Sequence, residues 1–238
     1  MKLDKQSIGY IERVVKAGRL VGIDNVIIEP DCVRAIDEDK TVVIHHTDNV
    51  PALEFGSIGL NRIDILLSRL ELVKNLDNFE VDAVVDETKA SPFTRSLGMK
   101  GKGTKVDYRC ANPATVQAPR KINDTIQFGI EFNSIIVDFL TKGQRAMGAS
   151  VVAFIADERG CTLQLSDINN DVFEHTFADK VHDLDNEEDS QPRFIHRYPL
   201  NIIIPLFKHE SSVAFGIGQK GMLKITVDGF DFYVLPRA

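Results

Sequence analysis

Residues 60–73 read LNRIDILLSRLELV: an apolar residue, an Asn, and then apolar residues spaced three and four positions apart. This spacing is typical of a helix with one buried face. The predicted buried residues are Ile63, Leu66, Leu67, Leu70 and Val73. Because an Asn side chain can accept a free backbone N–H of the first helical turn, we expect Asn61 to cap this helix.

The same pattern occurs at three other places, which begin with Leu3-Asp4, Phe132-Asn133 and Leu200-Asn201. It predicts four helices in all, at residues 5–17, 62–75, 134–147 and 202–211. An apolar residue before a cap can pack on the residue four positions past it. The expected pairs are Leu3 with Ile8, Leu60 with Ile65 and Phe132 with Val137, whereas the fourth copy has Pro205 at that place. In the other three helices, the predicted buried residues are Ile8, Ile11, Val14, Val15, Ile135, Ile136, Phe139, Leu140, Ile203, Leu206 and Phe207.

Short β-rich runs, separated by charged and glycine-containing turns, flank the predicted helices. We expect strands at residues 20–28, 32–36, 41–47, 52–58, 125–130, 150–156, 161–168, 172–177, 213–217, 222–227 and 230–235. The repeated unit is therefore strand, helix and about three antiparallel strands, a βαβββ unit. Helices that cover one face of antiparallel sheets give an α+β fold. With two units in each domain, the sequence predicts two similar domains.

A proline-containing segment separates the two halves. Residues 111–123 read ANPATVQAPRKIN and lack apolar periodicity, which is typical of an extended connector. We therefore place the domains at 1–111 and 123–238, with a connector (residues 112–122) between them.

Charge is distributed unevenly, although the net charge of −7 argues against nucleic-acid binding by the chain as a whole. The four predicted helices hold nine basic and five acidic residues, and the remainder holds 19 basic and 30 acidic residues. The basic residues are Lys5, Arg13, Lys16, Arg62, Arg69, Lys74, Lys142, Arg145 and Lys208. They are either ordinary solvated helix faces or a surface that binds DNA phosphates without reading sequence.

Several motifs resemble chemical sites without completing one. Gly216–Gly221 matches GxGxxG, but a β-like run follows where a dinucleotide site needs a helix. His45 and His46 would point to opposite faces of a strand, so they and Asp48 make a poor metal site. Asp183, Asp185 and Glu187 resemble the start of a calcium loop, but Glu188 replaces its required glycine. We expect no enzyme, no metal and no cofactor.

The chain contains no apolar run of the roughly 20 residues that cross a bilayer and no signal-peptide core. Its three cysteines, Cys32, Cys110 and Cys161, include no CxxC pair. These features predict a soluble, cytoplasmic protein with reduced thiols.

Three segments together resemble a known family: the connector ANPATVQAPRK after VDYRCA, the helix LNRIDILLSRLELV, and SSVAFGIGQKGMLKITVDGFDFYVL near the C-terminus. The whole chain resembles the sliding clamps of tailed bacteriophages, relatives of the proliferating-cell-nuclear-antigen ring. The resemblance implies two clamp domains per subunit and a homotrimeric ring around duplex DNA, with the helices facing the DNA. It also implies no membrane partner, and a polymerase and a clamp loader as protein partners.

The resemblance further implies two kinds of protein contact. Subunits would join by edge strands, at 104–110 with Val106 and Tyr108, and at 171–177 with Val172, Phe173 and Phe177; the alternative is that these strands face solvent. Partner tails would dock at Val116, Pro119, Leu235 and Pro236, although simple packing explains these residues equally well. Two segments lack an assigned role: the acidic insert 180–193, and residues 91–105, which are a DNA-contacting hairpin or an exposed turn.

Two other functions compete with the clamp. An oligomeric β-rich viral structural or assembly protein would need no basic helical surface. A small enzyme would depend on His45 and His46, and the rest of the sequence does not support one.

Overall fold

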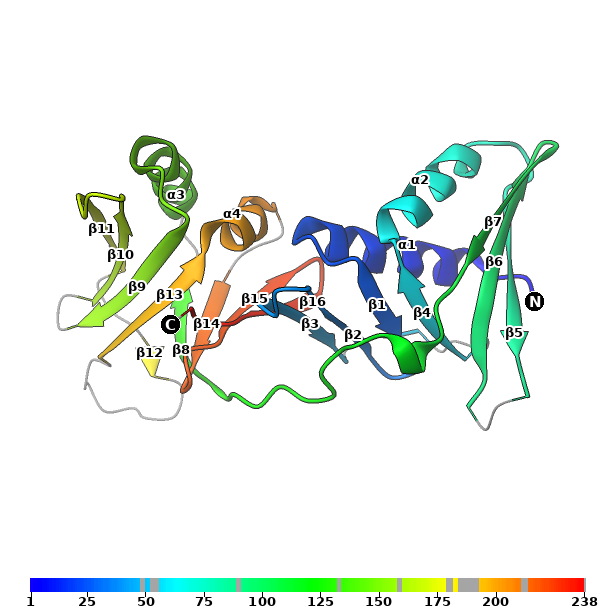
Figure 1. The fold of residues 1–238 in the computed structure, drawn as a ribbon, viewed down its shortest axis with the longest axis horizontal. Helices are drawn as coiled ribbons and strands as arrows, with labels where there is room; N and C mark the ends of the chain where they lie inside the picture. Colours follow the sequence, from blue (N-terminus) through cyan, green and yellow to red (C-terminus); the bar gives the residue numbers. More distant parts are fainter. Residues whose placement is uncertain are drawn as a thin grey trace. The chain divides into compact units, whose positions relative to one another are not determined.

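The computed structural model describes the chain apart from residues 48–49, 52–55, 89–90, 132–133, 158–159, 179–181, 184–192, 211–213 and 238. The chain divides into two compact units (Figure 1). Unit 1 comprises Met1–Glu38 and Val43–Lys121, and unit 2 comprises Asp39–Val42 and Ile122–Ala238. No helix in the described ranges is long and apolar enough to cross a membrane.

Unit 1 contains two βαβββ repeats. Its elements are α1 (Lys5–Leu20), β1 (Asn25–Ile28), β2 (Val33–Ile36), β3 (Val42–His46), β4 (Ser57–Asn61), α2 (Ile63–Lys74), β5 (Glu80–Asp86), β6 (Phe93–Gly101) and β7 (Thr104–Arg109). The first strand of the first repeat is only a short segment, in which the Leu3 N–H donates to the Val81 carbonyl at 2.8 Å. The strands lie in the order β3-β2-β1-β4-β6-β5, and β7 also pairs with β6. All these pairs are antiparallel except β4 with β6.

The two helices of unit 1 bury the faces that their apolar spacing predicts. In α2, all five predicted residues are buried. In α1, Asp4 is the N-cap, and its carboxylate accepts the Ser7 N–H at 2.7 Å. Ile8, however, is only half-buried, whereas Tyr10 and Ala17 complete the buried face of α1. The α+β prediction is therefore confirmed for this half of the chain.

Asn61 does not cap α2, so that prediction is wrong. It is the last residue of β4 and pairs with Asn25 of β1, which keeps its backbone extended. Arg62 turns the chain into the helix from the left-handed region, with φ 54°, and makes no side-chain cap. The Tyr108 hydroxyl contacts the Asn61 carbonyl and accepts the Asn61 N–H at 3.0 Å. Ile65 is 39% exposed, so the expected packing partner of Leu60 instead faces solvent.

Unit 2 repeats the βαβββ order. Its elements are β8 (Ile126–Glu131), α3 (Ser134–Met147), β9 (Val151–Asp157), β10 (Gly160–Ser166), β11 (Val172–Ala178), β12 (His182–Asp183), β13 (Phe194–Pro199), α4 (Leu200–Lys208), β14 (Ala214–Gly218), β15 (Leu223–Val227) and β16 (Phe230–Val234). One set of strands has the order β12-β8-β14-β15-β16, and the second sheet has the order β11-β10-β9-β13. Most of the 180–193 insert lies outside the described residues.

Aromatic side chains fill the core of unit 2. The ring of Phe154 on β9 lies 5.1 Å from that of Tyr198 on β13 and 5.7 Å from that of Phe215 on β14. Phe207 of α4 lies 5.2 Å from Phe215. The helix and both sets of strands therefore share one core, as a layered α+β domain requires.

The helix starts in unit 2 depart from the repeated pattern. Asn201 lies inside α4, whose N-cap is Pro199 without a side-chain bond, so the predicted Asn201 cap is wrong. Phe132 and Asn133 lie outside the described residues. In α3, Ile135 is 52% exposed, whereas the other three predicted residues are buried. The Ile135 prediction failed because Gly143 continues the buried face instead, against Leu165.

The Gly216–Gly221 motif forms a hairpin turn between β14 and β15. The Asp124 carboxylate accepts the backbone N–H groups of Lys220, at 3.0 Å, and of Met222, at 3.0 Å. A Cβ on Gly218 would lie 2.2 Å from an Asp124 oxygen, so only glycine leaves room for the carboxylate at this position. The motif therefore runs from strand to strand and holds a turn, which is not the strand-to-helix geometry of a dinucleotide site.

Removing one buried hydroxyl tests this core. Tyr198 is fully buried and its hydroxyl donates to the Gly221 carbonyl at 2.8 Å. Because Tyr198→Phe leaves that carbonyl without its donor, we expect the free energy of unfolding to fall by about 1–3 kcal/mol. Denaturant unfolding measures the change. Tyr233→Phe is the control, since it removes the same group from a tyrosine that is only half-buried; equal losses in the two variants would contradict the role of this bond.

Candidate nucleic-acid interface

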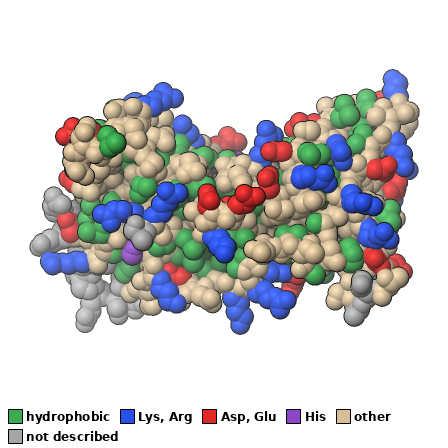
Figure 2. Space-filling model, viewed as in Figure 1, with side chains coloured by type: hydrophobic (Ala, Val, Ile, Leu, Met, Phe, Trp, Pro, Cys, Tyr) green, Lys and Arg blue, Asp and Glu red, His purple; other side chains and the backbone are tan. Residues whose placement is uncertain are grey.

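The solvent face of α1 carries a row of cations. Lys5, Arg13 and Lys16 are exposed and lie opposite the buried face of the helix. The helix continues to Leu20, three residues beyond the predicted end, and this adds the exposed Arg19, which the sequence prediction missed. Figure 2 shows Lys and Arg side chains over the helices, beside Asp and Glu side chains.

Ion pairs link α1 to α2. The Lys74 ammonium lies 2.7 Å from the Glu12 carboxylate, which also pairs with Lys16 at 2.8 Å. At the other end of the helix pair, Arg19 lies 3.1 Å from Asp64. Burial raises the pKa of Glu12, but the hydrogen bonds from Lys16 and Lys74 outweigh it and hold the pKa below its ordinary value. Two of the predicted DNA-binding cations thus share one carboxylate.

The solvent face of α2 is less basic than predicted. It carries Asp64, Ser68, Glu71 and two exposed apolar residues, Ile65 at 39% and Leu72 at 63% exposure. The cations of α2 lie at its ends and on its flank rather than along this face, although Arg62, just before the helix, is exposed.

Arg69 is turned toward β7 instead of solvent. It is half-buried, its guanidinium donates to the Asp107 carbonyl at 2.7 Å, and it lies 6.0 Å from the centre of the Tyr108 ring. We expected Arg69 to contact phosphate, but its guanidinium already donates a hydrogen bond to the Asp107 carbonyl. The seven-residue spacing from Arg62 could not show this, since the partner lies 38 residues away.

In unit 2, the predicted cations are exposed. Lys142 and Arg145 lie on the side of α3 opposite Phe139 and Leu140, and Lys142 pairs with Asp138 at 2.9 Å. Lys208 is exposed at the end of α4. Among the described residues, Arg145 and Lys208 make no ion pair.

Counted over the observed helices, the charge difference is slightly larger than predicted. The helices hold nine basic and four acidic residues, whereas the rest of the chain holds 19 basic and 31 acidic residues. Long, exposed cations on helices can contact phosphates but present no paired amides to base edges. The helical layer of each unit can therefore bind a polyanion without reading its sequence.

The basic segment 91–105 is a hairpin whose lysines pair with nearby acids. β6 and β7 meet at a turn where Lys102 and Gly103 have positive φ angles of 35° and 79°. The Lys100 ammonium lies 3.0 Å from Asp82, and that of Lys102 lies 3.4 Å from Asp77. These pairs favour the interpretation of an exposed turn over that of a DNA contact.

Both predicted edge strands have a free edge in the described part of the chain: β7 pairs only with β6, and β11 only with β10. The Cys110 N–H donates to the Arg95 carbonyl of β6 at 2.9 Å. Alternate residues of a strand direct their backbone groups to the same side, so Cys110, Tyr108 and Val106 direct theirs toward β6. The backbone groups of Lys105, Asp107 and Arg109 therefore point to the free edge of β7.

The same reasoning identifies the free edge of β11. The Asp167 N–H donates to the Asp171 carbonyl at 3.1 Å, across the turn between β10 and β11. Residues 173 and 175 therefore bond to β10, whereas Val172 and Glu174 present their backbone groups outward. Exposed edges favour strand addition, and on β7 such addition would displace the Arg69 guanidinium from the Asp107 carbonyl.

The predicted interface side chains differ in exposure. Val172 is 54% and Phe173 42% exposed, while Val106 and Phe177 are half-buried. Tyr108 is fully buried beneath Arg69, so the prediction that its side chain lies at an interface is wrong. The reason is that β7 directs Tyr108 toward α2 and Asn61 rather than outward.

The four residues predicted to bind partner tails are half-buried. Val116 and Pro119 belong to unit 1, and Leu235 and Pro236 belong to unit 2. Their partial exposure fits either packing or docking.

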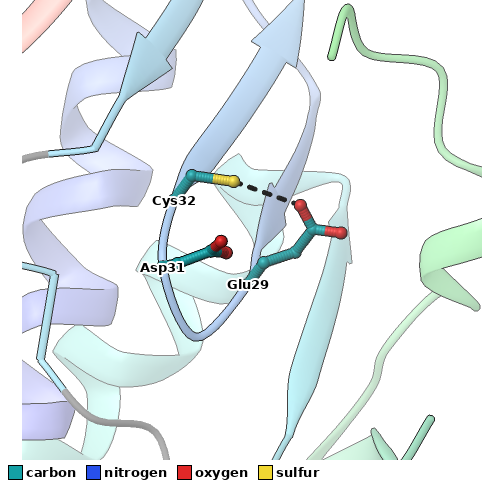
Figure 3. Close-up of side chains that lie close together, drawn as sticks. All are labelled: Glu29, Asp31 and Cys32. Atoms are coloured by element: carbon teal, nitrogen blue, oxygen red, sulfur yellow. Dashed lines mark hydrogen bonds between the residues drawn. The ribbon is translucent and has the colours of Figure 1, made fainter.

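The β1–β2 hairpin gathers Glu29, Asp31 and Cys32 within 4.8 Å of one another, a grouping that the sequence prediction missed (Figure 3). The Cys32 thiol donates to Glu29 at 3.1 Å, and Arg34 pairs with the same carboxylate oxygen at 2.8 Å. Burial and the bond to Glu29 raise the pKa of Cys32 to about 12. A protonated thiol and a neutralised carboxylate make a poor metal site, because metals bind the thiolate.

The histidines considered as metal ligands lie on β3. His46 is buried and His45 is half-buried, on opposite faces of the strand, while Asp48 lies outside the described residues. Asp185, Glu187 and Glu188, considered for a calcium loop, also lie outside them.

Comparison with known proteins identifies the fold. No family model and no curated protein matches the chain. Among solved structures, the A. fulgidus PCNA bound to the C-terminal region of FEN-1 aligns with TM-score 0.64 and 11% identity, covering 96% of each chain. PCNA from Entamoeba histolytica aligns with TM-score 0.59 and 14% identity, covering 95% of this chain and 94% of that chain. PCNA from Thermococcus kodakaraensis aligns with TM-score 0.59 and 12% identity, covering 100% of this chain and 99% of that chain. The chain therefore has the fold of the PCNA-like sliding clamps.

The ion pairs of Glu12 predict a specific dependence of stability on pH. Because the folded-state pKa lies below the ordinary value of 4.5, the pairs stabilise the fold above that pH and lose their contribution as the pH falls through the folded-state value. We expect Glu12→Gln to lower the free energy of unfolding by about 0.5–1 kcal/mol at pH 7. The difference from the unaltered chain should vanish in acid.

Denaturant unfolding at a series of pH values measures this difference. The control is Glu71→Gln, which changes an exposed carboxyl on α2. A Glu12→Gln effect that persists unchanged in acid would show that it does not arise from the ion pairs.

Proposed function

We propose that the chain is a DNA sliding clamp, a subunit of a homotrimeric ring that encircles duplex DNA and confers processivity on a replicative polymerase. The observation that carries this proposal is the charge of the helical layer on a clamp fold, nine basic against four acidic residues. A basic layer inside a ring and an acidic remainder outside would favour DNA in the hole.

Sequence-independent binding follows from the kind of contact available. The exposed cations bind phosphates, and DNA can slide past them because no base edge is read. A closed ring holds DNA topologically, so individual contacts can be weak. The clamp would tether other enzymes and perform no chemistry of its own.

Ring closure would use the two free strand edges. The edge of β7 in one subunit pairs with the edge of β11 in the next, in a head-to-tail contact that three subunits close. In an antiparallel pair, Glu174 lies opposite one of the outward residues of β7. A register that places Glu174 opposite Asp107 would bring two negative charges together. The other two registers place Glu174 opposite Arg109 or Lys105, which are oppositely charged.

Other parts of the proposal rest on the family resemblance. The domains would be residues 1–111 and 123–238, and the tails of the polymerase and the clamp loader would dock at Val116, Pro119, Leu235 and Pro236. In the A. fulgidus PCNA structure, the bound partner is the C-terminal region of FEN-1, which supports a tail as the docking element. A tailed bacteriophage would be the source, and the cytoplasm of its host the place of action.

Removing cations from α3 tests DNA binding. For the double variant Lys142→Ala/Arg145→Ala, we expect weaker binding of two duplexes of unrelated sequence, to the same degree. The slope of log affinity against log salt should become shallower by about 0.9 for each lost phosphate contact. Fluorescence anisotropy between about 50 and 200 mM salt measures both effects.

Arg197→Ala is the matched control, because Arg197 is exposed on β13 on the sheet face turned away from Phe154. An unchanged affinity and slope in the double variant would count against DNA binding by the helical layer.

Charge reversal at one edge tests the ring. Light scattering of the unaltered chain should give about 80 kDa, three times 26.6 kDa. Glu174→Lys should shift the mass toward the monomer at equal concentration, because it opposes two cations. A second charge reversal, Arg109→Glu or Lys105→Glu, should restore the trimer only if the altered residue lies opposite position 174. The variant that restores the trimer therefore identifies the register of the two strands. A monomer at all concentrations for the unaltered chain would remove the ring and count against the proposed function.

A further inference from the structure

The connector (residues 112–122) is attached to unit 1 at two places, although its sequence predicts an extended linker. The first lies at its start, where the Ala111 N–H donates to the Gly59 carbonyl of β4 at 2.8 Å. Next to it, the Asn112 side chain accepts the Ala114 N–H at 3.0 Å and caps the short 3-10 helix Pro113–Thr115. These bonds determine how the connector leaves β7.

The second attachment is a single side chain, Arg34 of β2. Its Nη1 donates to the Ala118 carbonyl at 3.3 Å, across 84 residues of sequence. Ala118 precedes Pro119, which restricts it to extended backbone, and Pro119 has no N–H to donate. The guanidinium therefore satisfies a carbonyl in a stretch that lies outside the helices and strands.

Glu29 fixes the direction of this guanidinium. One carboxylate oxygen of Glu29 accepts from Nε of Arg34 at 2.8 Å and lies 2.8 Å from Nη2. The pair leaves Nη1 directed at the connector. Arg34 is only 8% exposed, so its guanidinium is largely removed from water, while Ala118 is half-buried. The donor is ionised, so the bond is charge-assisted, and its length of 3.3 Å makes it a long one.

Apolar packing does not fill this region. A hollow of about 450 Å³ is lined by Arg34 and Glu29 on one side and by Asn112, Pro113, Ala114 and Arg120 of the connector on the other, with Ser57 and Ser91–Phe93. Arg34 lines this hollow, and its bond to Ala118 joins β2 to the connector beside it.

We propose that Arg34, oriented by Glu29, is the positioning residue of the connector and keeps Val116 and Pro119 in a fixed path on unit 1. Its importance for partner binding rests on the proposed clamp function, since a preformed connector would bind a partner tail without first being ordered. The attachment itself does not depend on that function.

Trypsin provides a direct test, because Arg120 and Lys121 are exposed cleavage sites inside the connector. We expect Arg34→Met to raise the rate of cleavage at these sites roughly tenfold, as loss of a charge-assisted bond should. The denaturant midpoint of unfolding is measured alongside, because Arg34→Met also leaves the Glu29 carboxylate without its partner; the cleavage rate should rise by more than the loss of global stability explains. Arg95→Met, an exposed arginine of β6, is the matched control and should leave the cleavage rate unchanged.

Two further variants keep the test decisive if Arg34→Met fails to fold. Arg34→Lys retains the charge beside Glu29 but lacks the forked donor, and Glu29→Gln removes the charge that orients Arg34; both should raise connector cleavage. Cleavage no faster than in the unaltered chain, in variants that fold, would overturn the proposal. The proposal would also be overturned if the rise in cleavage rate were fully explained by a lower free energy of global unfolding.

A peptide with the C-terminal sequence of the replicative polymerase from the same genome separates this proposal from the clamp function. If it binds the unaltered chain, we expect weaker binding to Arg34→Met and unchanged binding to Arg95→Met. Equal binding to both variants would overturn the positioning role. A peptide that binds none of the chains would count against the proposed function, and cleavage would still decide the attachment.

Discussion

Burial of one face of each helix is the constraint on which the rest of the structure depends. One face of α2 is buried on folding, and it consists of Ile63, Leu66, Leu67, Leu70 and Val73. Apolar burial of this kind is the main favourable contribution to folding. Once that face is fixed against the strands, the opposite face must meet solvent. The positions of Lys5 and Lys16 on α1, and of Lys142 on α3, follow from this requirement.

The strand edges provide the second constraint. A sheet that does not close on itself leaves edge strands with one side open to further pairing, and β7 and β11 are two such strands. Arg69 already occupies one acceptor of β7, the Asp107 carbonyl. In the connector, the Ala118 carbonyl likewise accepts from a side chain, that of Arg34. The architecture is thus determined as much by where backbone groups find partners as by its core.

Local chemistry predicted the elements better than it predicted their ends. Asp4 caps α1 as its residue type suggests, but Asn61 and Asn201 do not cap α2 and α4. In the latter two, a strand runs directly into the helix, and its pairing decides the backbone conformation at the junction. For the candidate interface, exposure of most cations could be predicted from helical periodicity. The roles of Arg69 and Tyr108 could not, because they depend on residues far away in the sequence.

The sequence by itself determined the α+β class, the repeated βαβββ order and the segregation of charge onto the helices. These properties are periodic or compositional, and each is set within a few residues. Only the tertiary structure decided which cations share carboxylates, as Lys16 and Lys74 share Glu12, and which arginines serve the fold, as Arg34 holds the connector. An ion pair or a hydrogen bond needs two groups within a few ångströms, and sequence spacing does not specify that distance between separate elements.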